Sequence, residues 1–354
     1  MAGATRRDEV ELGLSDDQEQ LVATIERLCR NEVTPERVRD AEPGGFDDRL
    51  WAALTGLGLA GMGAPETLGG GGAGVLDLAL ACEVLGGALA PVPFVEHAVA
   101  ARALARVLPE GDPLLDAVIA GERIATVAPV PAAGATARAV PAAGVAEVVV
   151  ALDGDALVLV ERDPPGAETP NLGASPVAPV ALEGAGRRVL REGEAATRTW
   201  QPLLDEWRVL TAAALTGLGA RALSLGVEYA KTRQQFGVPI GSFQAIAHAL
   251  ADAATAVDGA CLLTREAAWA ADEEPARQTV LAAMAFAFCS RAAQQAAGVS
   301  LHTHGGYGFM LEYDIQLAYR RAKAWALMGG DPRRGLHDLA DALFGPAVAT
   351  AGAR

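Results

Sequence analysis

Hydrophobic and polar positions change their spacing twice along the chain. Residues 13 to about 122 carry apolar side chains at helical spacing, beginning with Leu21, Ile25 and Leu28. Ser15 and Gln18 precede them with the separation of a capping box, which predicts that the first helix starts there. The glycine-rich run at 69–74 follows no strand and therefore predicts a helix connection rather than a phosphate loop. Further helices are predicted over residues 47–59, 76–87 and 97–108.

Proline, glycine and valine become more frequent between about Arg123 and Trp200. Two β-rich runs, over 147–152 and 156–161, flank the pair Asp153-Gly154. An Asp-Gly pair between two such runs is a strong signal for a short hairpin. This zone therefore predicts a small β domain.

Helical spacing returns at Leu203 and persists. Long helices are predicted over 203–232, 243–271, 277–298 and 315–328, and a shorter one over 336–344. The sequence thus predicts a mainly α fold with a small β domain. Its parts are an N-terminal helical domain (1–122), a reduced middle β domain (123–200) and a C-terminal helical bundle (201–354).

The composition excludes several classes of function. A net charge of −15 opposes nucleic-acid binding through a basic face. There is no run of eighteen apolar residues without a charge, and no apolar segment near Met1 that could act as a secretory signal. We therefore expect a cytoplasmic protein without a membrane span.

Four cysteines are scattered through apolar, helix-like stretches, and none forms a C-x-x-C pair with metal spacing. We expect each of them to act as a small buried hydrophobic side chain, without disulfides and without a structural zinc. They are Cys29, Cys82, Cys261 and Cys289.

Two local features leave their chemistry open. His302 and His304 stand two residues apart and cannot share one helix face, which excludes a metal site of the HExxH type. Gly305 and Gly306 indicate close approach of the backbone either to another helix or to a ligand. Arg233 ends a long helix, where it suits both the helix dipole and an anion, and local spacing does not decide between these roles.

Several segments together resemble the acyl-CoA dehydrogenase family. The most specific is YAKTRQQFGVPIGSFQAIAHALAD over 229–252, which carries the signature around Arg233. HTHGGYGF over 302–309 and YRRAK over 319–323 follow it, and GLAGMGAPETLGG over 58–70 precedes it. The family fold has an N-terminal helical domain, a middle β domain and a C-terminal four-helix bundle, which agrees with the three zones.

The resemblance implies FAD as cofactor and a CoA thioester as substrate. In the family, the flavin removes a hydride from the thioester β-carbon while a carboxylate takes the α-proton. On the substrate side, Arg208 matches an arginine that is typical of the bundle, and Asp205 matches a nearby contact to CoA.

The resemblance also implies cofactor-binding residues. Arg233 matches an arginine that reaches the flavin diphosphate of a neighbouring subunit, a group that suits a guanidinium fork. Phe236 and Gln244 match residues that line the same adenosine-diphosphate end. A Gln-x-x-Gly-Gly stretch, whose backbone approaches that end in the family, falls on His302, Thr303, His304, Gly305 and Gly306, with histidine in place of the glutamine.

Both positions at which the family places its catalytic base lack a carboxylate here. Counting from the YRRAK element, the glutamate of the family's Tyr-Glu-Gly-Thr motif falls on Gly329. Counting back from Arg233, the other base position falls on Trp207. Glu206 is adjacent, but one residue turns the side chain by about 100° around a helix, so it should face elsewhere. We therefore assign no catalytic residue and no metal ligand to this chain.

These matches and departures predict the non-catalytic subunit of a heterotetrameric acyl-CoA dehydrogenase, similar to actinobacterial enzymes that act on steroid side-chain thioesters. The middle zone also lacks the acidic-Gly-Ser-Asp loop and the Trp-Ile/Thr element that hold flavin in the family. Expected partners are a related catalytic subunit, the acyl-CoA thioester and an electron-transfer flavoprotein. One alternative is a self-sufficient dehydrogenase with Glu206, Glu312 or Asp331 as its base. Another is a scaffold or thioester-binding protein without a redox role.

Overall fold

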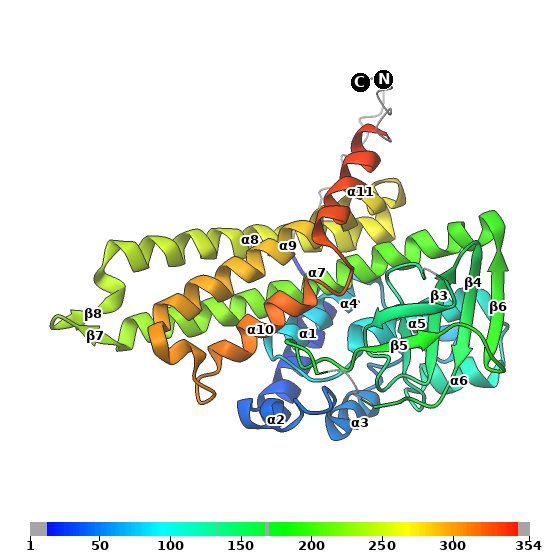
Figure 1. The fold of residues 1–354 in the computed structure, drawn as a ribbon, viewed down its shortest axis with the longest axis horizontal. Helices are drawn as coiled ribbons and strands as arrows, with labels where there is room; N and C mark the ends of the chain where they lie inside the picture. Colours follow the sequence, from blue (N-terminus) through cyan, green and yellow to red (C-terminus); the bar gives the residue numbers. More distant parts are fainter. Residues whose placement is uncertain (1–12, 133, 167–169, 346–354) are drawn as a thin grey trace, which may run out of the picture.

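The computed structural model describes residues 13–132, 134–166 and 170–345. Figure 1 shows a helical N-terminal part, a β part and a bundle of long helices. The predicted start of the first helix is confirmed, because Ser15 and Gln18 form the capping box. The N-terminal elements are α1 (Asp16–Glu32), α2 (Pro35–Asp40), α3 (Asp48–Gly56), η1 (Glu66–Leu68), α4 (Val75–Gly87), α5 (Phe94–Val107) and α6 (Pro113–Ile119).

The β domain contains the predicted hairpin. Strand β3 (Val148–Asp153) pairs antiparallel with β4 (Ala156–Glu161), and Asp153 lies opposite Ala156 across a two-residue turn. Gly154 has a φ of 60° in that turn, a value that glycine adopts without steric cost. The four-stranded sheet has the order β1-β3-β4-β6, and β2 pairs with β5 in a second, two-stranded sheet. The remaining strands are β1 (Ala125–Val127), β2 (Thr136–Val140), β5 (Ala178–Ala181) and β6 (Arg187–Glu192).

The central strands of this domain are buried on both faces. Val148 and Val150 of β3 join the main core of the molecule, whereas Val149 and Ala151 join a separate core that covers the other face. This two-sided burial explains why the strands are continuous apolar runs rather than alternating ones. The β domain is therefore packed against the helical parts and is not a surface appendage.

The bundle begins earlier than predicted. Helix α7 spans Gly193–Thr232, so it starts ten residues before Leu203 and contains Pro202. The prediction placed the start at Leu203, where helical spacing returns in the sequence. Pro202 lacks a backbone N–H and weakens the local preference for a helix, yet it lies inside α7. The other elements are β7 (Gln234–Gln235), β8 (Val238–Pro239), η2 (Ile240–Ser242), α8 (Gln244–Glu273), α9 (Pro275–His304), η3 (Gly305–Phe309), α10 (Ile315–Trp325) and α11 (Pro332–Phe344).

Glycines bring the N-terminal domain onto the bundle. A Cβ atom added at Gly217 of α7 would lie 1.8 Å from the carbonyl oxygen of Glu83, and one added at Gly86 of α4 would lie 2.1 Å from that of Ala214. Helices α4 and α7 therefore cross backbone against backbone, which only glycine allows at these positions. This crossing fixes the wall of the cavity described below.

One expectation needs correction. Cys29, Cys82 and Cys289 are buried, but Cys261 is only partly buried: it lies at the edge of the buried side of α8, where its thiol faces the carboxylate of Glu83 at 3.9 Å. Helices α7 and α8 are long and apolar enough to cross a membrane by length and composition alone, a test that a buried core helix also passes. The apolar segment of α7 is 72% buried as the core of the bundle, while that of α8 is 22% buried.

Candidate functional site

Arg233 stands at the end of α7 with its backbone held on both sides. Its N–H donates to the carbonyl of Tyr229 at 2.8 Å, and its own carbonyl accepts from the N–H of Ile240 at 2.8 Å. The side chain is exposed, and among the described residues no carboxylate forms an ion pair with it. The guanidinium is therefore available to an external anion.

The turn after Arg233 carries an aromatic ring into solvent. Strands β7 and β8 form a hairpin whose turn residues, Phe236 and Gly237, both have positive φ values of 54° and 82°. Phe236 is 93% exposed, and its ring meets that of Phe243 edge to face at 6.1 Å. A bulky residue held in the left-handed region and exposed to solvent is costly for a free monomer, and such strain is common at functional sites. Gln244, the first residue of α8, is exposed beside it.

The glycine-rich element lies at the end of α9. Gly305 has φ 63° and ψ −142°, and a Cβ atom added to Gly305 or Gly306 would have nothing within 4 Å. His302 is exposed. The hydroxyl of Thr303 donates to the carbonyl of Val299 at 2.9 Å, and Nδ1 of His304 lies 2.7 Å from the carbonyl of Ser300. Both side chains are buried and bonded to carbonyls of their own helix, so neither is free to reach an external ligand.

The end of α7, with Arg233, lies next to the glycine-rich element at the end of α9. The guanidinium of Arg233 lies over the ring of Tyr307 at 5.8 Å, and the ring of Tyr229 stacks on that of His304 at 4.2 Å. In Figure 1, the β7–β8 hairpin lies at the end of the bundle that points away from the β domain. The structure thus brings the predicted cofactor-binding residues together at one exposed end of the bundle.

The predicted substrate-side residues lie elsewhere. Asp205 is 1% exposed and accepts hydrogen bonds from Thr279 at 2.7 Å and Gln201 at 2.9 Å. Its carboxylate also lies 3.6 Å from the guanidinium of Arg208, and burial raises its pKa. Asp205 and Arg233 are roughly 40 Å apart along one helix, at about 1.5 Å of rise per residue. Asp205 is thus engaged within the chain.

The two base positions inferred separately from the sequence are neighbours in the structure. A Cβ atom added at Gly329 would lie 3.2 Å from ring atoms of both Trp207 and Phe286. Trp207 is 1% exposed, and its ring centroid lies 5.5 Å from that of Phe286. The space beside Gly329 is therefore filled by two aromatic rings.

The carboxylates considered as alternative bases do not share this space. Glu206 is buried and forms ion pairs with Arg102, at 3.0 Å, and with Arg106. Both arginines belong to α5, so Glu206 faces a different side of α7 from the rings beside Gly329, as the helical turn predicts. Glu312 and Asp331 are exposed.

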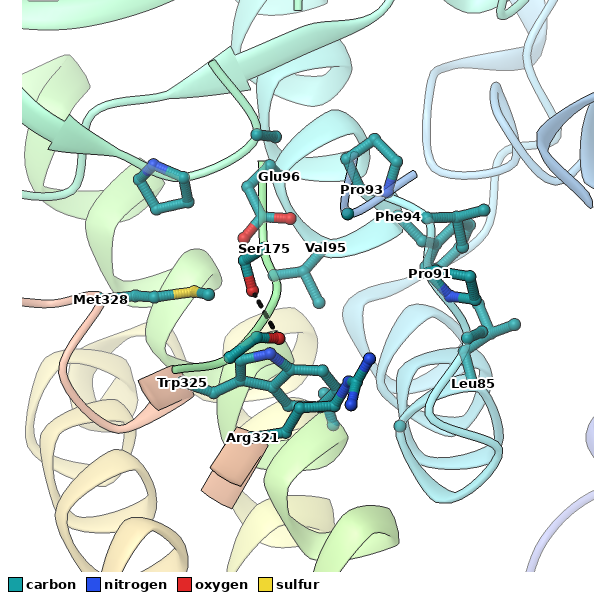
Figure 2. A pocket seen from close by; sticks show the side chains of 18 of the residues that line it. Leu85, Pro91, Pro93, Phe94, Val95, Glu96, Ser175, Arg321, Trp325 and Met328 are labelled. Carbon is teal, nitrogen blue, oxygen red and sulfur yellow. Dashed lines mark hydrogen bonds between the residues drawn. The ribbon is translucent and has the colours of Figure 1, made fainter. Parts of the chain in front are cut away.

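A cavity of about 90 Å³ lies where the three parts of the molecule meet. Figure 2 shows Glu96 of α5 on one wall, with Arg321 and Trp325 of α10 across from it. Ser175 from the β domain and Thr211 from α7 complete the polar lining. The cavity therefore has walls from all three domains.

Sequence reasoning missed Glu96. Glu96 is 9% exposed, and its burial raises the pKa of its carboxyl from 4.5 to about 7. The backbone N–H of Glu96 and the indole of Trp207 act in the opposite direction and lower this pKa, but burial has the larger effect. The indole nitrogen faces this carboxyl without a hydrogen bond of normal geometry. The only sequence signal was a glutamate within the apolar run that follows Pro93, and such a residue is usually read as facing solvent.

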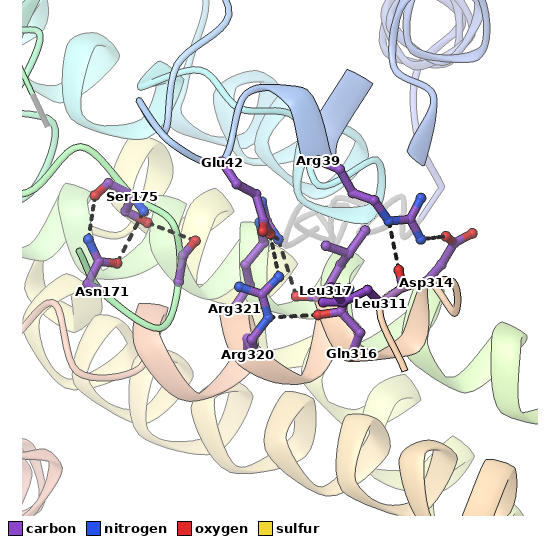
Figure 3. Close-up of polar contacts among 11 residues, drawn as sticks. Arg39, Glu42, Asn171, Ser175, Leu311, Asp314, Gln316, Leu317, Arg320 and Arg321 are labelled. Atoms are coloured by element: carbon purple, nitrogen blue, oxygen red, sulfur yellow. Dashed lines mark hydrogen bonds and ion pairs between the residues drawn. The ribbon is translucent and has the colours of Figure 1, made fainter. Parts of the chain in front are cut away.

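Polar contacts close the cavity on the side of α10. Arg320 and Arg321 both bind Glu42, which follows α2 (Figure 3). In the β domain, the side-chain amide of Asn171 donates to the carbonyl of Ser175 at 2.7 Å, and its oxygen accepts from the N–H of Ser175 at 3.2 Å, which shapes the loop between them. A Cβ atom added at Gly173 of this loop would lie 2.5 Å from the side chain of Ala324, so the loop packs directly on α10.

Comparison with known proteins identifies the family of this chain. The model of the acyl-CoA dehydrogenase N-terminal domain matches residues 15–110, and that of the C-terminal domain matches residues 197–343. Acyl-CoA dehydrogenase IpdE2 of Mycolicibacterium smegmatis is 32% identical over 337 residues, which cover 94% of this chain and 100% of that protein. The chain therefore belongs to the acyl-CoA dehydrogenase family, the FAD-dependent oxidoreductases that act on a CH–CH bond of CoA thioesters.

Solved structures confirm the predicted fold. The ChsE4–ChsE5 complex from Mycobacterium tuberculosis contains a chain with a TM-score of 0.84 and 28% identity, covering 96% of this chain and 100% of that one. A variant of the Tcur3481–Tcur3483 steroid ACAD gives a TM-score of 0.82 and 27% identity, covering 93% of this chain and 98% of that one. The name of each of these two complexes gives two different chains.

Proposed function

We propose that this chain is the non-catalytic subunit of a heterotetrameric acyl-CoA dehydrogenase. The observation that carries the proposal is the contrast between two regions of the molecule. The exposed end of the bundle offers Arg233 and open glycine backbone to an external ligand. The cavity at the domain junction has a volume of only about 90 Å³. A dry cavity of about 150 Å³ is the size that holds a benzene ring, so a tricyclic flavin ring does not fit inside this one.

The residues present therefore suit the adenosine-diphosphate end of FAD and not its ring. Arg233 would bind the diphosphate as a bidentate donor, because a guanidinium fork matches phosphate oxygens. The N–H of Gly305 already donates to the carbonyl of His302, and the open space beside Gly305 and Gly306 would let the cofactor approach the backbone closely. When bound, FAD supplies the hydride acceptor for oxidation of the thioester. In this proposal the ring and the base belong to the partner's active site.

Three observations support a related chain as that partner. ChsE4–ChsE5 and Tcur3481–Tcur3483 are two-chain complexes, and the second is described as a steroid ACAD. The apolar segment of α8 is largely uncovered, and Leu262 is 71% exposed there, as expected for a subunit interface. By the counting of motifs along the sequence, both family base positions fall on residues without a carboxylate, Gly329 and Trp207. We propose a steroid side-chain thioester as the substrate class, an electron-transfer flavoprotein as electron acceptor, and a cytoplasmic location.

One observation favours a second candidate, a self-sufficient dehydrogenase. Glu96 lies in the cavity with a pKa of about 7, the range that suits a general base at neutral pH. It replaces Glu206 as the base to test, because Glu206 is neutralised by two arginines. In this case the purified chain alone would bind FAD and oxidise acyl-CoA, and Glu96→Gln would abolish that activity.

The deciding experiment is the native mass and FAD content of the tagged protein purified from its own host. We expect a second, related chain and about one FAD for each pair of chains. Arg233→Ala should then release FAD from the complex without dissociating the two chains. A homomer with one FAD per chain would overturn the proposal.

A further inference from the structure

Beneath Arg233 lies a continuous group of four rings, which we call the ring cluster: Tyr229, His304, Tyr307 and Tyr313. Tyr229 stacks on His304 at 4.2 Å with an interplanar angle of 23°. Tyr313 meets both of these rings edge to face, at 6.4 Å and 6.0 Å. Tyr307 packs on Tyr313 at 5.6 Å and presents its own face to the guanidinium. The cluster thus runs from α7 through the end of α9 to the arginine.

Hydrogen bonds fix the inner part of this cluster. His304 is buried, and its Nδ1 donates to the carbonyl of Ser300, which sets the orientation of the ring. Tyr229 belongs to the last turn of α7, and its carbonyl accepts the N–H of Arg233. The base of the cluster and the backbone of the arginine are therefore parts of one rigid unit. Tyr307 is the outermost ring, 44% exposed.

The arginine side chain itself has little else to hold it. A free arginine samples many rotamers, and ordering it on a ligand costs free energy. A cation over an aromatic face is held electrostatically, because the face of the ring carries negative charge. The contact with Tyr307 restricts the guanidinium while its N–H donors remain unpaired with any carboxylate of the described residues.

We infer that Tyr307 is a positioning residue that holds Arg233 in the orientation that receives the diphosphate of a partner-bound FAD. The inference rests on the proposed function, and it adds a residue whose side chain acts through Arg233 and not on the cofactor. Removal of the ring should weaken FAD binding by roughly two- to fivefold, which corresponds to an exposed cation–π contact. Folding should be unaffected because the ring is half exposed.

The test is a double-mutant cycle on the assembled complex, with the FAD dissociation constant as readout. The apoprotein complexes of wild type, Tyr307→Leu, Arg233→Ala and the double variant are titrated with FAD. Tyr307→Phe keeps the ring and should bind like wild type. Tyr319→Leu is the matched control, because Tyr319 carries a second cation–π contact, to Lys323 at 5.7 Å, that does not involve Arg233. It should leave FAD affinity unchanged.

The cycle separates the two claims. If Tyr307 acts through the arginine, Tyr307→Leu weakens binding in the wild-type background and has no further effect beside Arg233→Ala. If Arg233→Ala weakens binding while Tyr307→Leu does not, or if the two effects simply add, the positioning role is refuted and the proposed function stands. If Arg233→Ala leaves the affinity unchanged, both claims fail.

Discussion

Replacing Glu96 by glutamine should change how the stability of this protein depends on pH. Glutamine has nearly the same shape as glutamate and cannot ionise, so the substitution removes one titration and little packing. The carboxyl is 9% exposed, and burial raises its pKa from 4.5 to about 7. The charged form of Glu96 is therefore disfavoured in the folded protein.

The sign and size of the effect follow from proton linkage. Below pH 4.5 the carboxyl is neutral in both the folded and the unfolded chain, and it imposes no penalty. As pH rises from 4.5 to 7, the unfolded chain releases the proton while the folded one retains it, so the free energy of unfolding falls. Above pH 7 the full penalty is reached, roughly 3 kcal/mol at about 1.4 kcal/mol per pKa unit. Wild type should therefore lose about 2 kcal/mol relative to Glu96→Gln between pH 5.5 and 8.

Urea unfolding of both proteins, at one protein concentration and at several pH values, measures this difference. Other titrating groups, such as Asp205 with its raised pKa, cancel in the comparison. Glu312→Gln, at an exposed glutamate, is the control and should differ from wild type by a constant amount. A difference between wild type and Glu96→Gln that stays flat from pH 5.5 to 8 would refute the argument that Glu96 is protonated in the folded state.

Three further predictions concern stability, and each is measured by urea unfolding. Gly217→Ala should lower the free energy of unfolding by about 3 kcal/mol or more, because the new Cβ atom would overlap a backbone carbonyl of α4. Its control is Gly298→Ala, where the space around the Cβ atom is open. This control should be neutral or stabilising by up to about 1 kcal/mol. Trp207→Ala should lower the free energy of unfolding by about 3–5 kcal/mol, because the indole is fully buried. A decrease of less than about 1 kcal/mol would contradict the packing role of Trp207. Glu206→Gln should lower the free energy of unfolding by about 3 kcal/mol, because it leaves the partly buried guanidinium of Arg102 without its carboxylate. Its control is Glu194→Gln, which removes a carboxylate from an exposed ion pair. This control should change the free energy of unfolding by less than about 0.5 kcal/mol.

Features with a local cause were predictable from the sequence. The hairpin around Gly154 and the capping box at Ser15 depend on residues a few positions apart, and both are confirmed. The start of α7 was placed too late because tertiary packing holds Pro202 inside a helix that its local preference would interrupt. The partial exposure of Cys261 depends on which side of α8 the rest of the bundle covers, and sequence spacing does not specify that side.

The candidate site also combines residues that the sequence could indicate with residues whose role depends on tertiary packing. Arg233 and the glycine element could be assigned by resemblance because they stand in contiguous motifs. The structure added that they meet, through a contact between Arg233 and Tyr307 that spans 74 positions of sequence. Glu96 could not be found, because its burial results from α7, α10 and the β domain closing around it together.

The meeting of Trp207 and Gly329 has a consequence for how a base could be restored. Glutamate at position 329 in the present chain would have to displace two rings that already lie 3.2 Å from the site of its Cβ atom. The new carboxylate would also lie against two aromatic rings that offer it no positive charge. Its charged form would therefore be disfavoured, which would raise the pKa of this glutamate and lower the free energy of unfolding. Glutamate in place of Trp207 would instead remove the largest fully buried side chain of the described residues and leave a cavity beside Gly329. The residues at positions 207 and 329 are therefore coupled through packing, so a carboxylate introduced at position 329 requires a smaller residue at position 207.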